Sequence, residues 1–233
     1  MVESTTSAGT SLRKSPQDPI AVSYGQILSP SDPAKGTDFL SFPFCHPKEC
    51  RKPKPLKGKP LRGECEVSEL YAVSFEEPVT GKAVCKRTVS VSELSQLGEA
   101  IDGLWESEFF VDDLRVVVPI GVALEDPSRE GKPKRRFLLT HHDFVLEVSR
   151  CPGGRGRKGF IASASVRAGM PGGTVDMDRL IEEGGGEVEF LYSVSWTTSE
   201  AAPASRLLQS TGPIEDEGGG DGSFVGPLLL VSV

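Results

Sequence analysis

The stretch EVEFLYSVSW, residues 187–196, has the pattern that decides the fold. Every second residue in it is aromatic or β-branched, namely Val188, Phe190, Tyr192, Val194 and Trp196. Because successive side chains of a strand point to opposite faces, this alternation predicts a half-buried strand, with Trp196 buried on the same face as Phe190 and Val194. One strand cannot bury an apolar face alone, so other sheet-forming segments must pack against it.

Such segments precede this strand in the chain, at residues 69–75, 114–124, 137–148 and 160–166. Residues 114–124 are almost all Val, Ile and Leu, interrupted by Arg115, Pro119 and Gly121, which favours a mostly buried strand with a bulge or bend. Residues 160–166 follow a glycine-rich turn, and the side chains expected to share one face there are Phe160, Ala162, Ala164 and Val166.

One helix is expected, at residues 91–106. Ser90 and Glu93 have the spacing of a capping box, in which each side chain satisfies a backbone N–H of the first turn. Leu94, Leu97, Ile101 and Leu104 follow at helical spacing. Strands separated by turns, with a single helix, predict an all-β fold class: a β-sandwich-like domain with one short amphipathic helix and disordered termini.

The apolar residues concentrate in the middle of the chain, and this sets the expected domain boundaries. Residues 1–22 are rich in Ser, Thr and Pro and predict a disordered N-terminal tail. Residues 23–197 form the β-rich domain, and 37% hydrophobic content in 233 residues is adequate for its core. Residues 198–233 predict a low-complexity C-terminal tail.

Charge and hydropathy exclude several classes of protein. The net charge of -7 gives the whole protein no electrostatic reason to bind nucleic acid. No run approaches the roughly 20 apolar residues that span a bilayer, and the first residues have no secretory-signal pattern, so the printed chain is expected to be soluble. The sequence has no asparagine, which excludes N-linked glycosylation.

No motif predicts an enzyme, a cofactor or a metal site. His141, His142 and Asp143 are adjacent, but neighbouring strand residues point to opposite faces, so both histidines cannot easily reach one ion. We expect one packed and one exposed histidine. The paired residues Asp112 and Asp113 are typical of a turn or strand entry. The glycine-rich run GGRGRKG lacks the lysine and hydroxyl ending of a phosphate-binding loop, which favours a hairpin turn.

The segment between Cys45 and Cys65 is rich in Lys and Pro, and its sequence is HPKECRKPKPLKGKPLRGE. Such a run is typical of a solvated extended loop, and its functional alternative is a surface for an acidic partner. The cysteine spacings match no common zinc pattern. Disulfides are expected in an oxidising compartment and free thiols in a reducing one, so the residues alone leave open the redox state of Cys50, Cys65 and Cys151.

Several segments together resemble the lumenal N-terminal domain of the transmembrane 9 superfamily, the nonaspanins. These segments are FPFC (42–45), AVCKR (83–87), FFVDDL (109–114), RFLLTHHDF (136–144) and EVEFLYSVSW. The similarity covers residues 24–196. After the two aspartates the family has Leu-Pro-aromatic-Gly, whereas this chain has Leu114 followed by Arg115 and three valines.

The resemblance implies a non-enzymatic lumenal domain of a Golgi or endosomal multispanning membrane protein that takes part in sorting membrane-protein cargo. It also implies a truncated member, with membrane association only through segments missing from this chain. Cys45 and Cys85 lie inside the resembling motifs, and in an oxidising lumen they are the expected disulfide partners. The alternative is a freestanding soluble β-sandwich that binds carbohydrate or peptide, because a fold does not fix a function.

Overall fold

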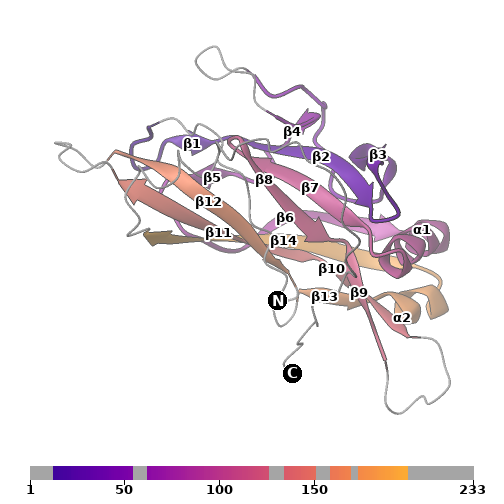
Figure 1. Cartoon of the computed structure of the whole chain (residues 1–233). Helices are drawn as coiled ribbons and strands as arrows, with labels where there is room; N and C mark the ends of the chain where they lie inside the picture. The colour runs from indigo at the N-terminus through magenta and orange to yellow at the C-terminus, as the bar shows by residue number, and fades with distance from the viewer. Residues whose placement is uncertain (1–12, 55–61, 126–133, 151–157, 169–172, 199–233) are drawn as a thin grey trace.

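The computed structural model describes residues 13–54, 62–125, 134–150, 158–168 and 173–198. Two larger sheets lie as two layers, and the helices α1 (Val91–Asp102) and α2 (Met177–Glu182) lie together at one end (Figure 1). Strands predominate throughout the described residues, which confirms the all-β class.

The first larger sheet has the order β12-β11-β14-β6. Its strands are β6 (Val79–Val89), β11 (His141–Arg150), β12 (Gly159–Ala168) and β14 (Gly186–Thr198). The second has the order β3-β2-β7-β8, with β4 paired to β2. Its strands are β2 (Val22–Ser29), β3 (Asp32–Asp38), β4 (Cys65–Glu66), β7 (Glu106–Val111) and β8 (Leu114–Pro119).

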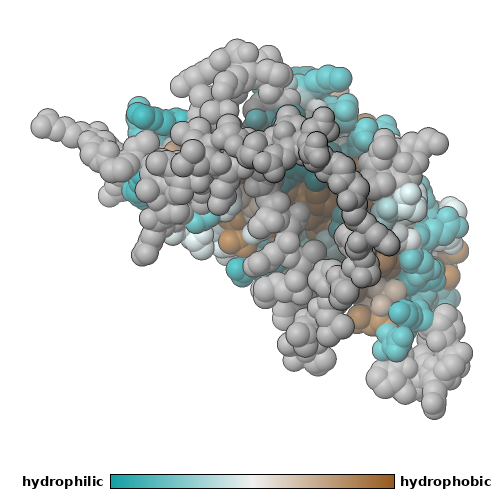
Figure 2. All heavy atoms as spheres, viewed as in Figure 1, coloured by the Kyte–Doolittle hydropathy of each residue, from teal (hydrophilic) through white to brown (hydrophobic). Residues whose placement is uncertain are grey.

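Smaller elements complete the architecture. β1 (Pro19–Ile20) pairs with β5 (Val73–Ser74), and a three-stranded sheet has the order β13-β10-β9. The strands of this three-stranded sheet are β9 (Gly121–Leu124), β10 (Arg135–Leu139) and β13 (Thr174–Asp176). A 3-10 turn, η1, covers Phe39–Ser41. On the face in Figure 2, hydrophilic residues are visible along much of the described edge, and hydrophobic residues are visible in the middle of the face and toward its lower right.

The core lies between the two larger sheets, where aromatic rings from both meet. Phe109 of β7 lies 5.0 Å from Tyr24 of β2 and 6.0 Å from Phe144 of β11, measured between ring centroids. Tyr71 stands between the layers, with its ring 5.3 Å from that of Tyr192 on β14. All three ring pairs meet edge to face, an arrangement that aromatic rings prefer over a face-to-face sandwich.

β14 confirms the strand predicted from EVEFLYSVSW. Val188, Phe190, Tyr192 and Val194 are all buried, at 0–4% exposure. Trp196 packs against the same core but is only half-buried, which corrects the prediction of full burial. The reason is its position: the last β6 partner of β14 is Val79, opposite Val194, so no β6 residue covers the sheet beside Trp196.

The predicted helix is present but ends four residues early, at Asp102. The capping box forms, because Ser90 accepts from Glu93 N and Glu93 accepts from Ser90 N at 2.9 Å. Gly103 caps the C-terminus, and Leu104 adopts a positive φ of 55° that ends the helix. The second helix, α2, contradicts the expectation of a single helix: Asp176 caps it by accepting from Arg179 N at 3.2 Å.

Gly121 explains why the apolar run 114–124 divides into β8 and β9. A Cβ at Gly121 would meet both the Ile101 side chain of α1 and the carbonyl oxygen of Phe137 on β10. Only glycine permits this close approach of α1, β9 and β10. Of the bulge or bend expected in this run, the structure has a bend, and it divides the single predicted strand by carrying the chain out of the second sheet into the three-stranded sheet.

Two other strand predictions need correction. Residues 69–75 bury the alternate side chains Tyr71, Val73 and Phe75, but of the predicted strand only Val73–Ser74 is formed. In β12 a β-bulge opposite Glu147 and Val148 shifts the register, so Ile161 is buried instead of Phe160 and Ala162. A bulge inserts one residue and reverses the face of everything beyond it, which sequence alternation does not reveal.

The N-terminal boundary expected at Val22 lies too late. Lys14 forms a bridge with Gly159 of β12, with N···O distances of 2.7 and 3.0 Å, and β1 begins at Pro19. Residues 14–20 therefore pair with the sheets although they are poor in apolar side chains. Residues 1–12 and 199–233, which make up the rest of the predicted tails, lie outside the described residues.

Candidate functional site

The predicted pair Cys45 and Cys85 are joined by a disulfide in the structure, with their Cα atoms 5.9 Å apart. This separation is within the range that a disulfide spans. Cys85 lies on β6 opposite Phe190, and Cys45 follows η1. The bond thus ties the Phe-rich segment 39–45 to the first sheet, next to a hydrogen bond of 3.0 Å from Arg87 Nη1 to the Phe44 carbonyl.

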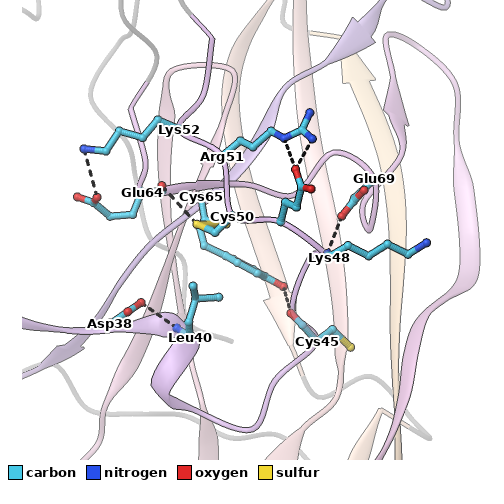
Figure 3. The surroundings of a disulfide bond; sticks show 12 residues. Asp38, Leu40, Cys45, Lys48, Cys50, Arg51, Lys52, Glu64, Cys65 and Glu69 are labelled. Atoms are coloured by element: carbon cyan, nitrogen blue, oxygen red, sulfur yellow. Dashed lines mark hydrogen bonds and ion pairs between the residues drawn. A yellow bond between two sulfur atoms is a disulfide. The ribbon is translucent and has the colours of Figure 1, made fainter.

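A second pair, Cys50 and Cys65, was not predicted. Their Cα atoms lie 5.1 Å apart, and the bond closes a loop between residues separated by 15 positions (Figure 3). Cys65 begins β4 and is buried opposite Tyr24 of β2, so the bond fastens the Lys/Pro-rich segment to the second sheet. The signal in the sequence was that these two cysteines lie on either side of the most basic part of that segment, residues 51–62. Cys151 lies outside the described residues.

Beside this disulfide lies an open groove of about 380 Å³. We call it the Lys48 groove; its lining residues are Lys48, Glu49, Arg51, Lys54, Glu66, Ser68 and Glu69. Charges within it are partly paired, since Arg51 binds the Glu49 carboxylate (Figure 3). At its rim Lys52 Nζ lies 4.0 Å from a Glu64 carboxylate oxygen. The groove is thus a polar, charged surface rather than an apolar ligand pocket.

Inside the core, a chain of polar groups crosses between the sheets. The Tyr24 hydroxyl lies 3.3 Å from the Cys45 carbonyl oxygen and 3.3 Å from the Tyr71 hydroxyl, which in turn lies 3.3 Å from His142 Nδ1. Burial raises the pKa of both tyrosines and lowers the pKa of His142 to about 4. The imidazole is therefore neutral near neutral pH.

The adjacent cavity is too small for an organic ligand. Its volume is about 10 Å³, which is about the space that one water molecule needs. Tyr24, Cys45, Tyr71, Ser107 and His142 are among its lining residues. These groups therefore act as a structural polar network within the sandwich.

His141 and His142 point to opposite faces of β11, as the alternation predicts. His141 Nε2 lies 2.8 Å from Ser193 Oγ on the outer face, and Gly81 N donates to the same oxygen at 2.9 Å. His141 is half-buried rather than exposed, and His142 is packed against Phe109, with ring centroids 5.2 Å apart. Within the described residues no group of three or more His, Cys, Asp or Glu side chains is placed to hold a metal ion.

Asp112 and Asp113 form the two-residue turn between β7 and β8, which confirms the predicted turn. Asp112 is buried and has a positive φ of 53°. Its Oδ1 accepts from Ala21 N at 3.3 Å and lies 3.1 Å from Lys14 Nζ. Burial raises the pKa of Asp112, and the nearby Lys14 opposes that rise. The contacts of Asp112 with Lys14 and Ala21 therefore hold the N-terminal segment against the turn.

No helix among the described residues combines the length and apolarity required to cross a membrane. Comparison with known sequences places these features in a wider context. The family model described as Endomembrane protein 70 matches residues 37–211.

The similar curated proteins carry a consistent name. "Transmembrane 9 superfamily member 1" of Mus musculus is 28% identical over 204 residues, which is 88% of this chain and 31% of the relative. The protein of that name from Pongo abelii is 28% identical over 180 residues, 77% of this chain and 28% of the relative. "Transmembrane 9 superfamily member 3" of Arabidopsis thaliana is 23% identical over 185 residues, 79% of this chain and 29% of the relative. The chain therefore spans less than a third of the length of these relatives.

Proposed function

This chain belongs to the endomembrane protein 70 family, the transmembrane 9 superfamily, and on that premise we propose that it is the lumenal domain of a Golgi or endosomal multispanning protein. The domain takes part in sorting membrane-protein cargo and has no catalytic role. The family is one of membrane proteins, as the names of its members state.

The observation that carries the lumenal assignment is the pair of disulfides, Cys45–Cys85 and Cys50–Cys65. Disulfides persist in oxidising compartments and are rare where glutathione and thioredoxin keep thiols reduced. Two bonds that each tie a loop to a sheet therefore support folding in the lumen of the secretory pathway.

The non-catalytic assignment is supported by the hydrogen bonds that the side chains capable of acid–base chemistry make within the domain. His142 bonds to Tyr71 inside the core, and His141 bonds to Ser193 in the sheet. Glu147 accepts from Ser163 Oγ at 2.6 Å across β11 and β12. A general base has to reach a substrate proton, whereas these groups are used between neighbouring strands.

A glycosylation reporter tests the lumenal assignment. The printed sequence has no asparagine, so Pro78→Asn creates the one acceptor within it, Asn-Val-Thr, at positions 78–80. Residues 78 and 80 are exposed at the start of β6. When the protein is expressed from its own gene, the variant should be heavier than the control Pro78→Asn/Thr80→Ala, and glycosidase treatment should remove the difference. Equal masses for the two variants contradict the lumenal assignment.

The sorting role needs a separate measurement in cells. Depletion of the protein should change the distribution of tagged membrane proteins between Golgi, endosomes and cell surface, and the protein itself should co-localise with Golgi or endosomal markers. Unchanged distributions after complete depletion contradict a sorting role even if the glycosylation result is positive.

A further inference from the structure

The segment that carries the Lys48 groove is strongly basic in an acidic protein. Residues 46–62 contain seven Lys and Arg residues and one Glu, whereas the whole chain has a net charge of -7. The lumenal role proposed above makes no use of this concentration of charge. Among the described lining residues, Lys48, Arg51 and Lys54 stand beside Glu49, Glu66 and Glu69, so a complementary partner carries both anionic groups and hydrogen-bond donors.

The described root of this segment is held firmly in place. The Cys50–Cys65 disulfide fixes one side, and Glu66 N donates to the Arg51 carbonyl at 2.8 Å. Lys48 N donates to a Glu69 carboxylate oxygen at 3.0 Å, and Ser23 Oγ donates to the Arg62 carbonyl at 2.8 Å. The charges at the groove are thus presented on a preformed surface, which lowers the entropy cost of binding.

Lys48 and Lys54 are the cations of the groove that remain available. Arg51 is paired with Glu49 and Lys52 with Glu64, whereas no ion pair involves Lys48 or Lys54 among the described residues. Both are exposed, and Figure 3 shows the Lys48 ammonium directed away from the disulfide. On the same surface, Glu66 and Glu69 offer carboxylate acceptors.

We propose that the Lys48 groove binds an extended acidic peptide segment, whose side-chain carboxylates pair with Lys48 and Lys54. The backbone N–H groups of such a segment donate to the carboxylates of Glu66 and Glu69, so one ligand uses both signs of charge in the groove. This deepens the proposed function, on which it rests for the source of the peptide: an acidic lumenal segment of a membrane-protein cargo.

The mixed charge of the lining favours a peptide over an anionic membrane surface. A lipid surface presents negative charge uniformly and has no N–H donors in a row, so the carboxylates of Glu66 and Glu69 would meet no row of donors there. The volume of about 380 Å³ also falls within the range of sites that enclose small ligands, and it suits a few residues of a chain rather than a broad surface.

The experiment measures binding of a short fluorescent peptide of alternating Glu and Gly to the full chain with its disulfides formed. Lys48→Glu/Lys54→Glu should weaken binding roughly tenfold, because two attractive pairs become repulsive. The matched control Lys82→Glu/Lys134→Glu makes the same change in net charge at exposed lysines outside the groove, and it should leave the affinity unchanged. Binding should weaken with added salt.

Two results would overturn the proposal. One is equal loss of peptide binding in both double variants, since that indicates a response to net charge alone. The other is groove-dependent sedimentation with phosphatidylserine-containing vesicles and no peptide binding, which assigns the surface to membranes. Thermal unfolding of each variant establishes that it is folded. If the glycosylation test is negative but peptide binding is intact, the lumenal assignment is wrong and the assignment of the Lys48 groove as a peptide site still holds.

Discussion

Lys14 Nζ lies 3.1 Å from Asp112 Oδ1, and both side chains are almost completely buried. Lys14 also donates to the Pro19 carbonyl at 3.0 Å, while its backbone pairs with Gly159 of β12. One residue near the N-terminus therefore connects an edge of the first sheet to the β7–β8 turn of the second.

Removal of this ammonium should be strongly destabilising. Lys14→Met leaves the buried Asp112 carboxylate without its countercharge, and breaking a buried pair in this way costs about 3 to 5 kcal/mol. The double variant Lys14→Met/Asp112→Asn should recover part of the loss, since asparagine tolerates the positive φ and carries no charge. Urea unfolding measures both, with exposed Lys82→Met as a control. A loss below about 1 kcal/mol in Lys14→Met contradicts the buried pair.

His142 should make the stability of the domain depend on pH. Its pKa is about 4 in the folded state and about 6.5 in the unfolded chain, so the unfolded chain binds the additional proton between these values. The contribution is complete above about pH 6.5 and declines as the pH falls toward 4, by at most about 1.4 kcal/mol per pH unit. Unfolding free energies across this window should show the decline, and His142→Phe should reduce it.

Unfolding free energies of a second variant show whether burial or the hydrogen bond to Tyr71 lowers the pKa of His142. Burial is the largest cause of the lowered pKa of His142, so Tyr71→Phe, which removes only the bonded hydroxyl, should keep most of the pH dependence. If His142→Phe retains the full slope, the pH dependence originates in other groups.

Peptide mapping under non-reducing conditions tests the disulfides. Protein from the secretory pathway should yield Cys45 linked to Cys85 and Cys50 linked to Cys65. The chain-entropy model gives roughly 4 kcal/mol for the first bond, whose cysteines are 40 positions apart, and roughly 3 kcal/mol for the second. Cys85→Ser should therefore lower the unfolding free energy more than Cys50→Ser. Other pairings, or free thiols at all four positions, contradict the arrangement.

Trp196 should contribute less to stability than a fully buried aromatic residue. Its ring lies 5.4 Å from that of Phe75, and Nε1 donates to the Glu77 carbonyl at 2.9 Å, but the side chain is half-buried. Trp196→Ala should cost about 2 kcal/mol, below the roughly 3 to 5 kcal/mol expected for Tyr192→Ala, because Tyr192 has no exposed surface. Denaturant unfolding of the two variants should give that order, and a larger loss at Trp196 contradicts it.

The sequence by itself determined the features that depend on neighbouring residues. Alternation from Val188 to Val194 placed the core face of β14, and the Ser90–Glu93 box placed the start of α1. The Asp112–Asp113 turn was also visible. Each of these is a local pattern, because strand faces, caps and turns follow from the φ/ψ preferences and side-chain directions of a few consecutive residues.

The tertiary structure alone decided what depends on distant partners. β11 and β14 pair in parallel, although the segment between them contains β12, β13 and α2. The bulge that turns Ile161 inward, the partner of Cys50 and the countercharge of Asp112 are likewise set by residues far along the chain. Local periodicity carries no information about these choices, because they depend on which arrangement buries the apolar faces of both sheets together and gives the buried Asp112 its countercharge.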